Sequence, residues 1–126
     1  MPNVRVVLDT NVVVSLLLDT PALRPVFEAF RSGLIEPVLT TSMLDELEDV
    51  LGRSSLNIDE NARKEFLTVY RWRSHWIDHP LPVTERVDPG DNAVLSAALT
   101  ARTILVTGDH GLQRLHPFRN VVPILS

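Results

Sequence analysis

The chain has 126 residues, and 44% of them are hydrophobic. This length and composition suit one compact domain over residues 1–126 and exclude a disordered chain. The formal net charge of −4 gives no overall attraction to nucleic acid or membranes, so an RNA or DNA ligand would need a local patch or a metal ion. Cysteine is absent, which excludes disulfides, a thiolate nucleophile and a zinc ribbon.

The first half of the chain predicts strands alternating with helices. Val4–Leu8 is typical of a buried strand, and the apolar segment 4–18 is too short and too polar to span a bilayer. No small-residue cleavage site follows it, so we expect no export signal and a cytoplasmic protein. The remaining pattern predicts helices at 12–18, 20–32, 42–51 and 57–74, a strand at 35–40 and a loop at 54–57, with Ser42 and Asn57 opening their helices.

The second half continues the same alternation. We expect a short edge strand at 76–78, a proline-rich loop at 79–90, a helix capped by Asp91, a strand at 103–106, a helical turn at 112–115 and a last strand at 121–124. Alternation of this kind predicts an α/β sandwich built around a parallel sheet.

Acidic residues lie where such a sheet would bring them together. Asp9 follows the first strand and Asp109 follows strand 103–106, while Glu46 and Asp91 lie between them. The carboxyl ends of parallel strands share one edge, and ligands bind there. Two carboxylates about 4 Å apart repel by roughly 4 kcal/mol at an effective dielectric near 20. A cluster with no basic partner nearby therefore needs a cation, and all-oxygen ligation favours Mg²⁺ or Mn²⁺.

Each acid also has a purely structural interpretation. Asp9 fits a plain helix cap, and Asp91 fits another, with Asp88 competing for that role. Glu46 fits a solvated acid on a helix, and Asp109 fits a turn residue. The joint pattern of all four acids favours a shared acidic pocket that binds a metal ion.

Four short motifs around these acids resemble a known family. Leu8–Asn11 is similar to the first motif of the PIN-domain ribonucleases, and Ser42–Leu47 is similar to the second. Asp88–Asn92 resembles the third motif and Val106–Asp109 the fourth. The motifs occur in the family's order and span essentially the whole chain. Within the family, the chain resembles the VapC-like toxins of bacterial toxin–antitoxin pairs.

The resemblance implies a three-layer α/β/α sandwich with a parallel sheet of four to five strands. It implies a Mg²⁺- or Mn²⁺-dependent endoribonuclease with an RNA substrate, an antitoxin protein partner and a homodimeric state. The catalytic and metal-binding acids would be Asp9, Glu46, Asp91 and Asp109, with Glu46 orienting or deprotonating the attacking water and Asn11 and Thr107 supporting the pocket. Many family members carry a further acid where this chain has Gly111, which bears on a second metal site.

A basic segment is the leading candidate for RNA contact. Its cations are interleaved with aromatic residues, as in surfaces that grip phosphates and stack bases, and are Arg63, Lys64, Arg71 and Arg73. The alternative is a solvated helix face whose aromatic residues lie in the core or at a dimer interface.

Two rival functions stay open. A phosphohydrolase of the haloacid-dehalogenase kind also begins with an Asp after its first strand, but Asn11 stands where it needs a second Asp and Lys64 is the only lysine. The other rival is a non-catalytic PIN module that binds RNA or protein. Intact acids at all four motifs oppose this second rival, and Gly111 keeps it open.

Overall fold

A five-stranded parallel sheet organises the computed structural model, which describes residues 4–53 and 56–126. The strands are β1 Val4–Leu8, β2 Ile35–Leu39, β3 His75–Trp76, β4 Ile104–Val106 and β5 Ile124–Leu125. The helices are α1 Thr10–Leu18, α2 Thr20–Ser32, α3 Thr41–Leu51, α4 Glu60–Arg73, α5 Pro89–Ala101 and α6 His110–Gln113. Of the loop expected at 54–57, residues 54 and 55 lie outside the described residues.

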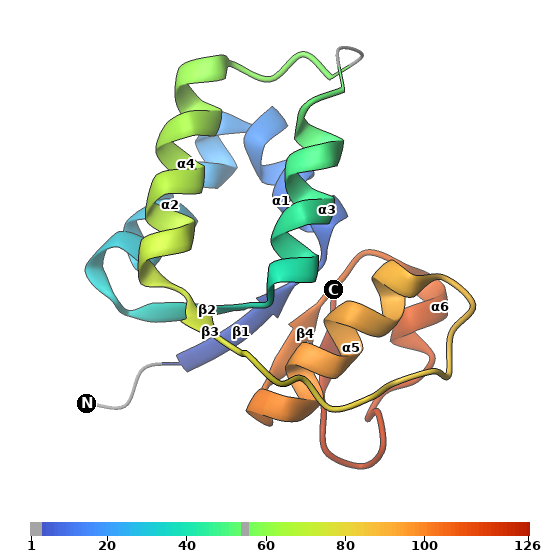
Figure 1. Ribbon diagram of the computed structural model, residues 1–126. Coiled ribbons are helices and arrows are strands. Elements are labelled where there is room, and N and C mark those ends of the chain that lie inside the picture. Colours follow the sequence, from blue (N-terminus) through green and yellow to red (C-terminus); the bar gives the residue numbers. More distant parts are fainter. Residues whose placement is uncertain (1–3, 54–55) are drawn as a thin grey trace.

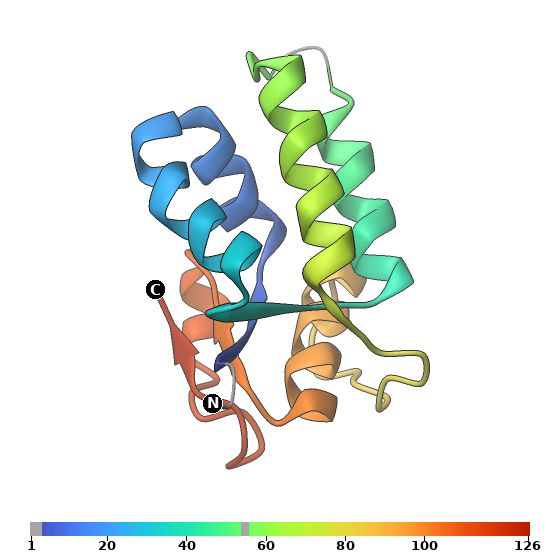
Figure 2. The same cartoon turned by 90° about the vertical axis from the view of Figure 1, so that its left-hand side faces the viewer.

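The strand order is β3-β2-β1-β4-β5, and every neighbouring pair is parallel. Helices flank the sheet on both sides: Figure 2 shows α1, α2 and α6 to the left of β1 and α3, α4 and α5 to its right. Figure 1 shows α3 and α4 running side by side. The predicted α/β/α sandwich with a parallel sheet is therefore confirmed. In the described part of the chain, no helix combines the length and the apolarity needed to cross a bilayer.

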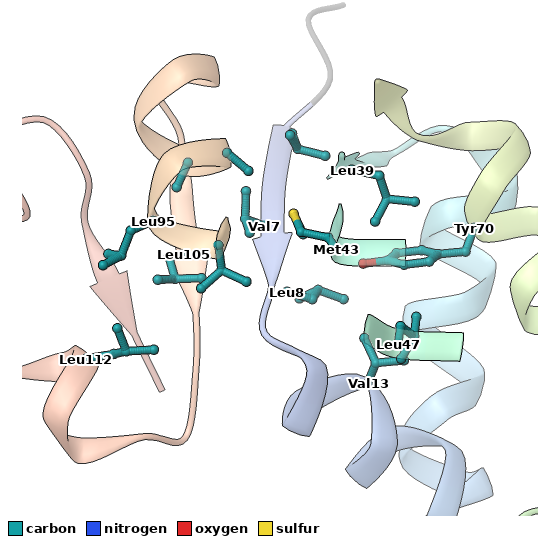
Figure 3. Packing of buried hydrophobic residues seen from close by; sticks show 14 of the residues in the cluster. Val7, Leu8, Val13, Leu39, Met43, Leu47, Tyr70, Leu95, Leu105 and Leu112 are labelled. Atoms are coloured by element: carbon teal, nitrogen blue, oxygen red, sulfur yellow. The ribbon is translucent and has the colours of Figure 1, made fainter. Parts of the chain in front are cut away.

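The core packs against both faces of the central strands. Val7 and Leu105 are completely buried, as expected for strands with helices on both sides. Figure 3 shows Leu95, Leu105 and Leu112 on one side of β1 and Met43, Leu47 and Tyr70 on the other. Rings of Phe30, Phe66 and Tyr70 stack within the second group, with centroids 5.0–6.4 Å apart. This packing fixes the strand ends from which the acidic residues project.

Three helix starts differ from those predicted, because the capping side chains lie elsewhere. The first helix begins directly after Asp9 rather than at residue 12. Thr40, and not Ser42, caps α3, and its hydroxyl accepts the amide hydrogen of Met43. Asp59, and not Asn57, caps α4. For α3 and α4, an extended residue with a side-chain oxygen close to the predicted cap formed the cap bond instead. For α1, Asp9 takes the capping role already considered for it.

The last elements are also shifted. The edge strand is β3, His75–Trp76, rather than 76–78, and the final strand is β5, Ile124–Leu125, rather than 121–124. Val122 instead forms an antiparallel bridge with Phe118, because the chain turns back on itself just before β5. The helical turn expected at 112–115 begins earlier, as α6.

Candidate active site

Adjacent strands deliver the first two predicted acids to the same edge of the sheet. Asp9 follows β1 and caps α1, and its amide donates to the carbonyl of Val106 at the end of β4 (3.0 Å). Asp109 follows β4 and caps α6 by accepting the amide hydrogen of Gly111 at 2.7 Å. Both acids thus serve as caps, and both also face the same region beyond the strands.

Thr107 links these two acids. Its side chain is fully buried, and its hydroxyl donates to Oδ2 of Asp9 at 2.7 Å. The same hydroxyl accepts the backbone amide hydrogen of Asp109 at 3.1 Å. One buried oxygen therefore fixes the relative positions of the two loops, which is a supporting role of the kind predicted for this residue.

Glu46 approaches the pocket from α3. Its carboxylate accepts a long hydrogen bond from the hydroxyl of Thr10, the residue after Asp9 (3.4 Å). The first turn of α5 passes against it: a Cβ atom added to Gly90 would lie 2.7 Å from Oε1 of Glu46. The approach is close because residue 90 has no side chain.

Asp91 lies in the first turn of α5 and does not cap it. The prediction of Asp91 as the cap is wrong: Asp88 is the cap, and its carboxylate accepts the amide hydrogen of Gly90 at 2.9 Å. Pro89 occupies the first helical position, where its missing N–H costs nothing. The carboxylate of Asp91 is therefore free of the cap, and its side chain is only 13% exposed.

The acids influence one another electrostatically. Burial raises the pKa of Asp9, the hydrogen bonds from Thr107 and Thr10 oppose the rise, and the charges of Asp91 and Asp109 add to it. Burial likewise raises the pKa of Glu46, and the charges of Asp9, Asp88 and Asp91 add to the rise. The fold therefore brings all four predicted acids into one electrostatic unit.

The pocket contains a basic partner that sequence reasoning missed. Nε of Arg86 donates to Oδ2 of Asp91 at 3.1 Å. The assumption that the acids have no cation nearby is therefore wrong. The loop before α5 carries no periodic pattern, so nothing predicted where Arg86 would point. The one available signal was its position five residues before Asp91 in the sequence.

The donor set fits a hard divalent cation, since every candidate ligand is a carboxylate oxygen. Within residues 4–53 and 56–126, however, no three acid or histidine side chains stand close enough together to hold a metal ion. Each carboxylate instead faces a partner: Asp9 the Thr107 hydroxyl, Glu46 that of Thr10, Asp91 the Arg86 guanidinium, and Asp109 the amides of its own helix. Convergence on an ion therefore requires a side chain such as Asp91 to turn away from its present partner.

The other predicted residues lie outside this acid network. Asn11 is exposed in the first turn of α1 and lines a neighbouring hollow with Leu16 and Gly108. Arg63, Lys64 and Arg71 on α4 line a groove against α3, together with Leu51, Leu67 and Thr68. Arg73, at the end of α4, is not among the lining residues. The lining basic residues also meet acids: Arg63 and Lys64 lie near Glu60, and Arg71 contacts Glu48.

The two tryptophans of the same segment are exposed, whereas its Phe66 and Tyr70 are buried in the core. Trp72 is 69% exposed, and the guanidinium of Arg73 stacks 4.2 Å from its ring centroid. The Trp76 indole is also partly exposed and donates to the carbonyl of Arg71 at 3.0 Å. This placement excludes the core interpretation of both tryptophans.

Comparison with known proteins identifies the family. A family model described as the PIN domain matches residues 5–111, which span the first four strands and all four acids. No curated protein matches the chain significantly. PIN domains generally use divalent metals and are typically nucleases. The matched range covers most of the chain, and we conclude that this protein belongs to the PIN-domain family.

Proposed function

We propose that this PIN domain is a Mg²⁺- or Mn²⁺-dependent endoribonuclease. The observation that carries the proposal is that Asp9 and Asp109 follow adjacent parallel strands and share the Thr107 hydroxyl, at the carboxyl edge of the sheet. Glu46 reaches the same edge through its hydrogen bond with Thr10. This edge is where open α/β sheets bind ligands. Membership of a family of nucleases gives the reaction class.

In this proposal Asp9, Asp91 and Asp109 hold the ion, directly or through water, and Glu46 orients or deprotonates the attacking water. A divalent ion, when bound, would polarise the scissile phosphodiester and stabilise the negative charge that develops on the leaving oxygen. Thr107 holds Asp9 in place, and Thr10 holds Glu46, so the carboxylates meet the substrate in fixed positions. Asn11, exposed in the first turn of α1, would hydrogen-bond an RNA phosphate.

We further propose that the protein is the toxin of a toxin–antitoxin pair, that an antitoxin restrains it, and that it forms a homodimer. The support is the likeness of the four motifs to the VapC-like toxins, and the exposed Trp72 and Trp76 suit a protein interface. A small DNA-binding protein encoded beside this chain would be the expected antitoxin. Its co-expression should relieve the growth inhibition caused by the chain alone.

The first test is metal-dependent cleavage of single-stranded RNA by the purified protein. We expect cleavage with Mn²⁺ or Mg²⁺, its loss on chelation, and its recovery when the metal is returned, because the proposed ligands are all oxygens. Products should be separated on a denaturing gel. If no RNA tested is cleaved with either metal while RNA still binds, the chain is a non-catalytic binding module instead.

The basic side chains in the last turn of α4 give a separate prediction about substrate binding. Reversing two charges with Arg71→Glu and Arg73→Glu should weaken the binding of single-stranded RNA by at least about tenfold. The variant would lose phosphate contacts, and with them the counterion release that favours binding. The salt dependence of binding should also become shallower. Binding should be measured in an Asp9→Asn background, so that the RNA stays intact.

The matched control places the same charge change elsewhere. Arg5 and Arg24 are both exposed, on β1 and α2, and neither lines the groove. The double variant Arg5→Glu, Arg24→Glu should bind RNA nearly as well as the parent. Equal losses in the two double variants would mean that net charge, and not the position of the cations on α4, determines affinity.

A further inference from the structure

Arg86 is held in a fixed position beside the acidic pocket. In Figure 1 the loop before α5 runs along that helix and reaches α6. The backbone of Arg86 is tied to the side chain of Asn92 in both directions: its N–H donates to Oδ1 at 2.9 Å, and its carbonyl accepts from Nδ2 at 2.8 Å. The preceding residue, Glu85, accepts two hydrogen bonds of 2.7 Å from Arg119. These contacts place the loop without involving the guanidinium of Arg86.

The guanidinium itself extends from Asp91 towards Gly111 at the start of α6. Besides the bond from Nε to Asp91, its Nη2 lies 2.8 Å from the point where a Cβ atom on Gly111 would stand. The same point lies 3.1 Å from Oδ1 of Asp109. The positive charge therefore extends from one candidate metal ligand towards another, through space that is open because residue 111 has no side chain.

We propose that Arg86 is a resident counter-cation that competes with the divalent ion for Asp91. This inference rests on the proposed function, because it assumes that Asp91 is a metal ligand. A dication on Asp91 would repel a guanidinium bonded to the same carboxylate, so each disfavours the other. When the ion binds, Arg86 is released, and its planar set of donors becomes available to an RNA phosphate beside the ion.

The competition predicts tighter metal binding when the charge of Arg86 is removed. We expect Arg86→Gln to bind Mn²⁺ about tenfold more tightly than the wild type, by isothermal titration calorimetry without RNA. Arg86→Lys keeps the charge and should stay near the wild type. Arg31→Gln removes an equal charge from the exposed Glu28 pair on α2 and should leave Mn²⁺ affinity unchanged. The Asn92 bonds use only the backbone of Arg86, so the loop should keep its position, which thermal denaturation would check.

A second measurement separates competition from a general change in charge. A 2′-O-methyl RNA that cannot be cleaved should bind Arg86→Gln about tenfold more weakly than wild type with Mn²⁺, and equally well without it. One outcome overturns the inference and leaves the nuclease proposal standing. In it the wild type binds Mn²⁺, the Asp9→Asn variant does not, and Arg86→Gln binds Mn²⁺ no more tightly than the wild type. If neither wild type nor Arg86→Gln binds Mn²⁺, both are overturned.

Discussion

Replacing Asp9 by asparagine is expected to abolish Mn²⁺-dependent RNA cleavage while leaving the domain folded. The carboxylate lies between β1 and α1, next to Asp91 and Asp109 in the electrostatic unit, so its charge is central to any shared ion. Loss of one charged ligand should lower the cleavage rate by at least about a thousandfold. Asparagine keeps one side-chain oxygen for the cap bond from Thr10, but its NH2 group replaces the oxygen that accepts from Thr107, so we expect the free energy of unfolding to fall by about 1–2 kcal/mol.

The matched control is Asp59→Asn. Asp59 is also a helix cap and accepts an amide hydrogen at 2.9 Å, but it is exposed at the start of α4. Both variants therefore lose one charge from a helix cap, and only Asp9→Asn should lose cleavage. Cleavage is measured as a single-turnover rate, and far-ultraviolet circular dichroism checks that both variants are folded. Near-wild-type cleavage by Asp9→Asn would remove this residue from the proposed chemistry.

The strand-end acids were predictable because their surroundings are local in sequence. An apolar run followed by Asp9, and a second run followed by Thr107 and Asp109, defines two strands and the residues at their carboxyl ends. Parallel pairing of β1 with β4 then brings the ends together without any further specification. The gathering of these residues at one edge followed from pattern and topology alone.

The remaining features of the site depend on which of several chemically equivalent side chains forms a given hydrogen bond. Asp88 and Asp91 were both plausible caps, and the proline between them selected Asp88. The position of Arg86 depends on two hydrogen bonds with Asn92 in an irregular loop, where no periodicity exists to read. Sequence reasoning therefore found the acids, and missed the cation that lies among them.

Thr107 gives the second large effect, because one buried hydroxyl serves two groups. Thr107→Val keeps the shape of the side chain but leaves Oδ2 of Asp9 and the amide of Asp109 without this partner. We expect the free energy of unfolding to fall by about 1–3 kcal/mol, the usual cost of leaving a buried polar group without its hydrogen bond. Cleavage should fall more than tenfold, by our order-of-magnitude estimate, because Asp9 is no longer held in one orientation.

Thr107→Ser separates the hydroxyl from the methyl group. Serine keeps the bonds to Asp9 and Asp109 but leaves a small gap in the buried space, at a cost of about 1 kcal/mol. The two variants should thus lose stability to a similar degree, and only the valine variant should lose most of its cleavage rate. Denaturant unfolding and single-turnover cleavage, measured on the same preparations, give the comparison. Equal activity in both variants would show that the Thr107 hydroxyl stabilises the fold without positioning Asp9.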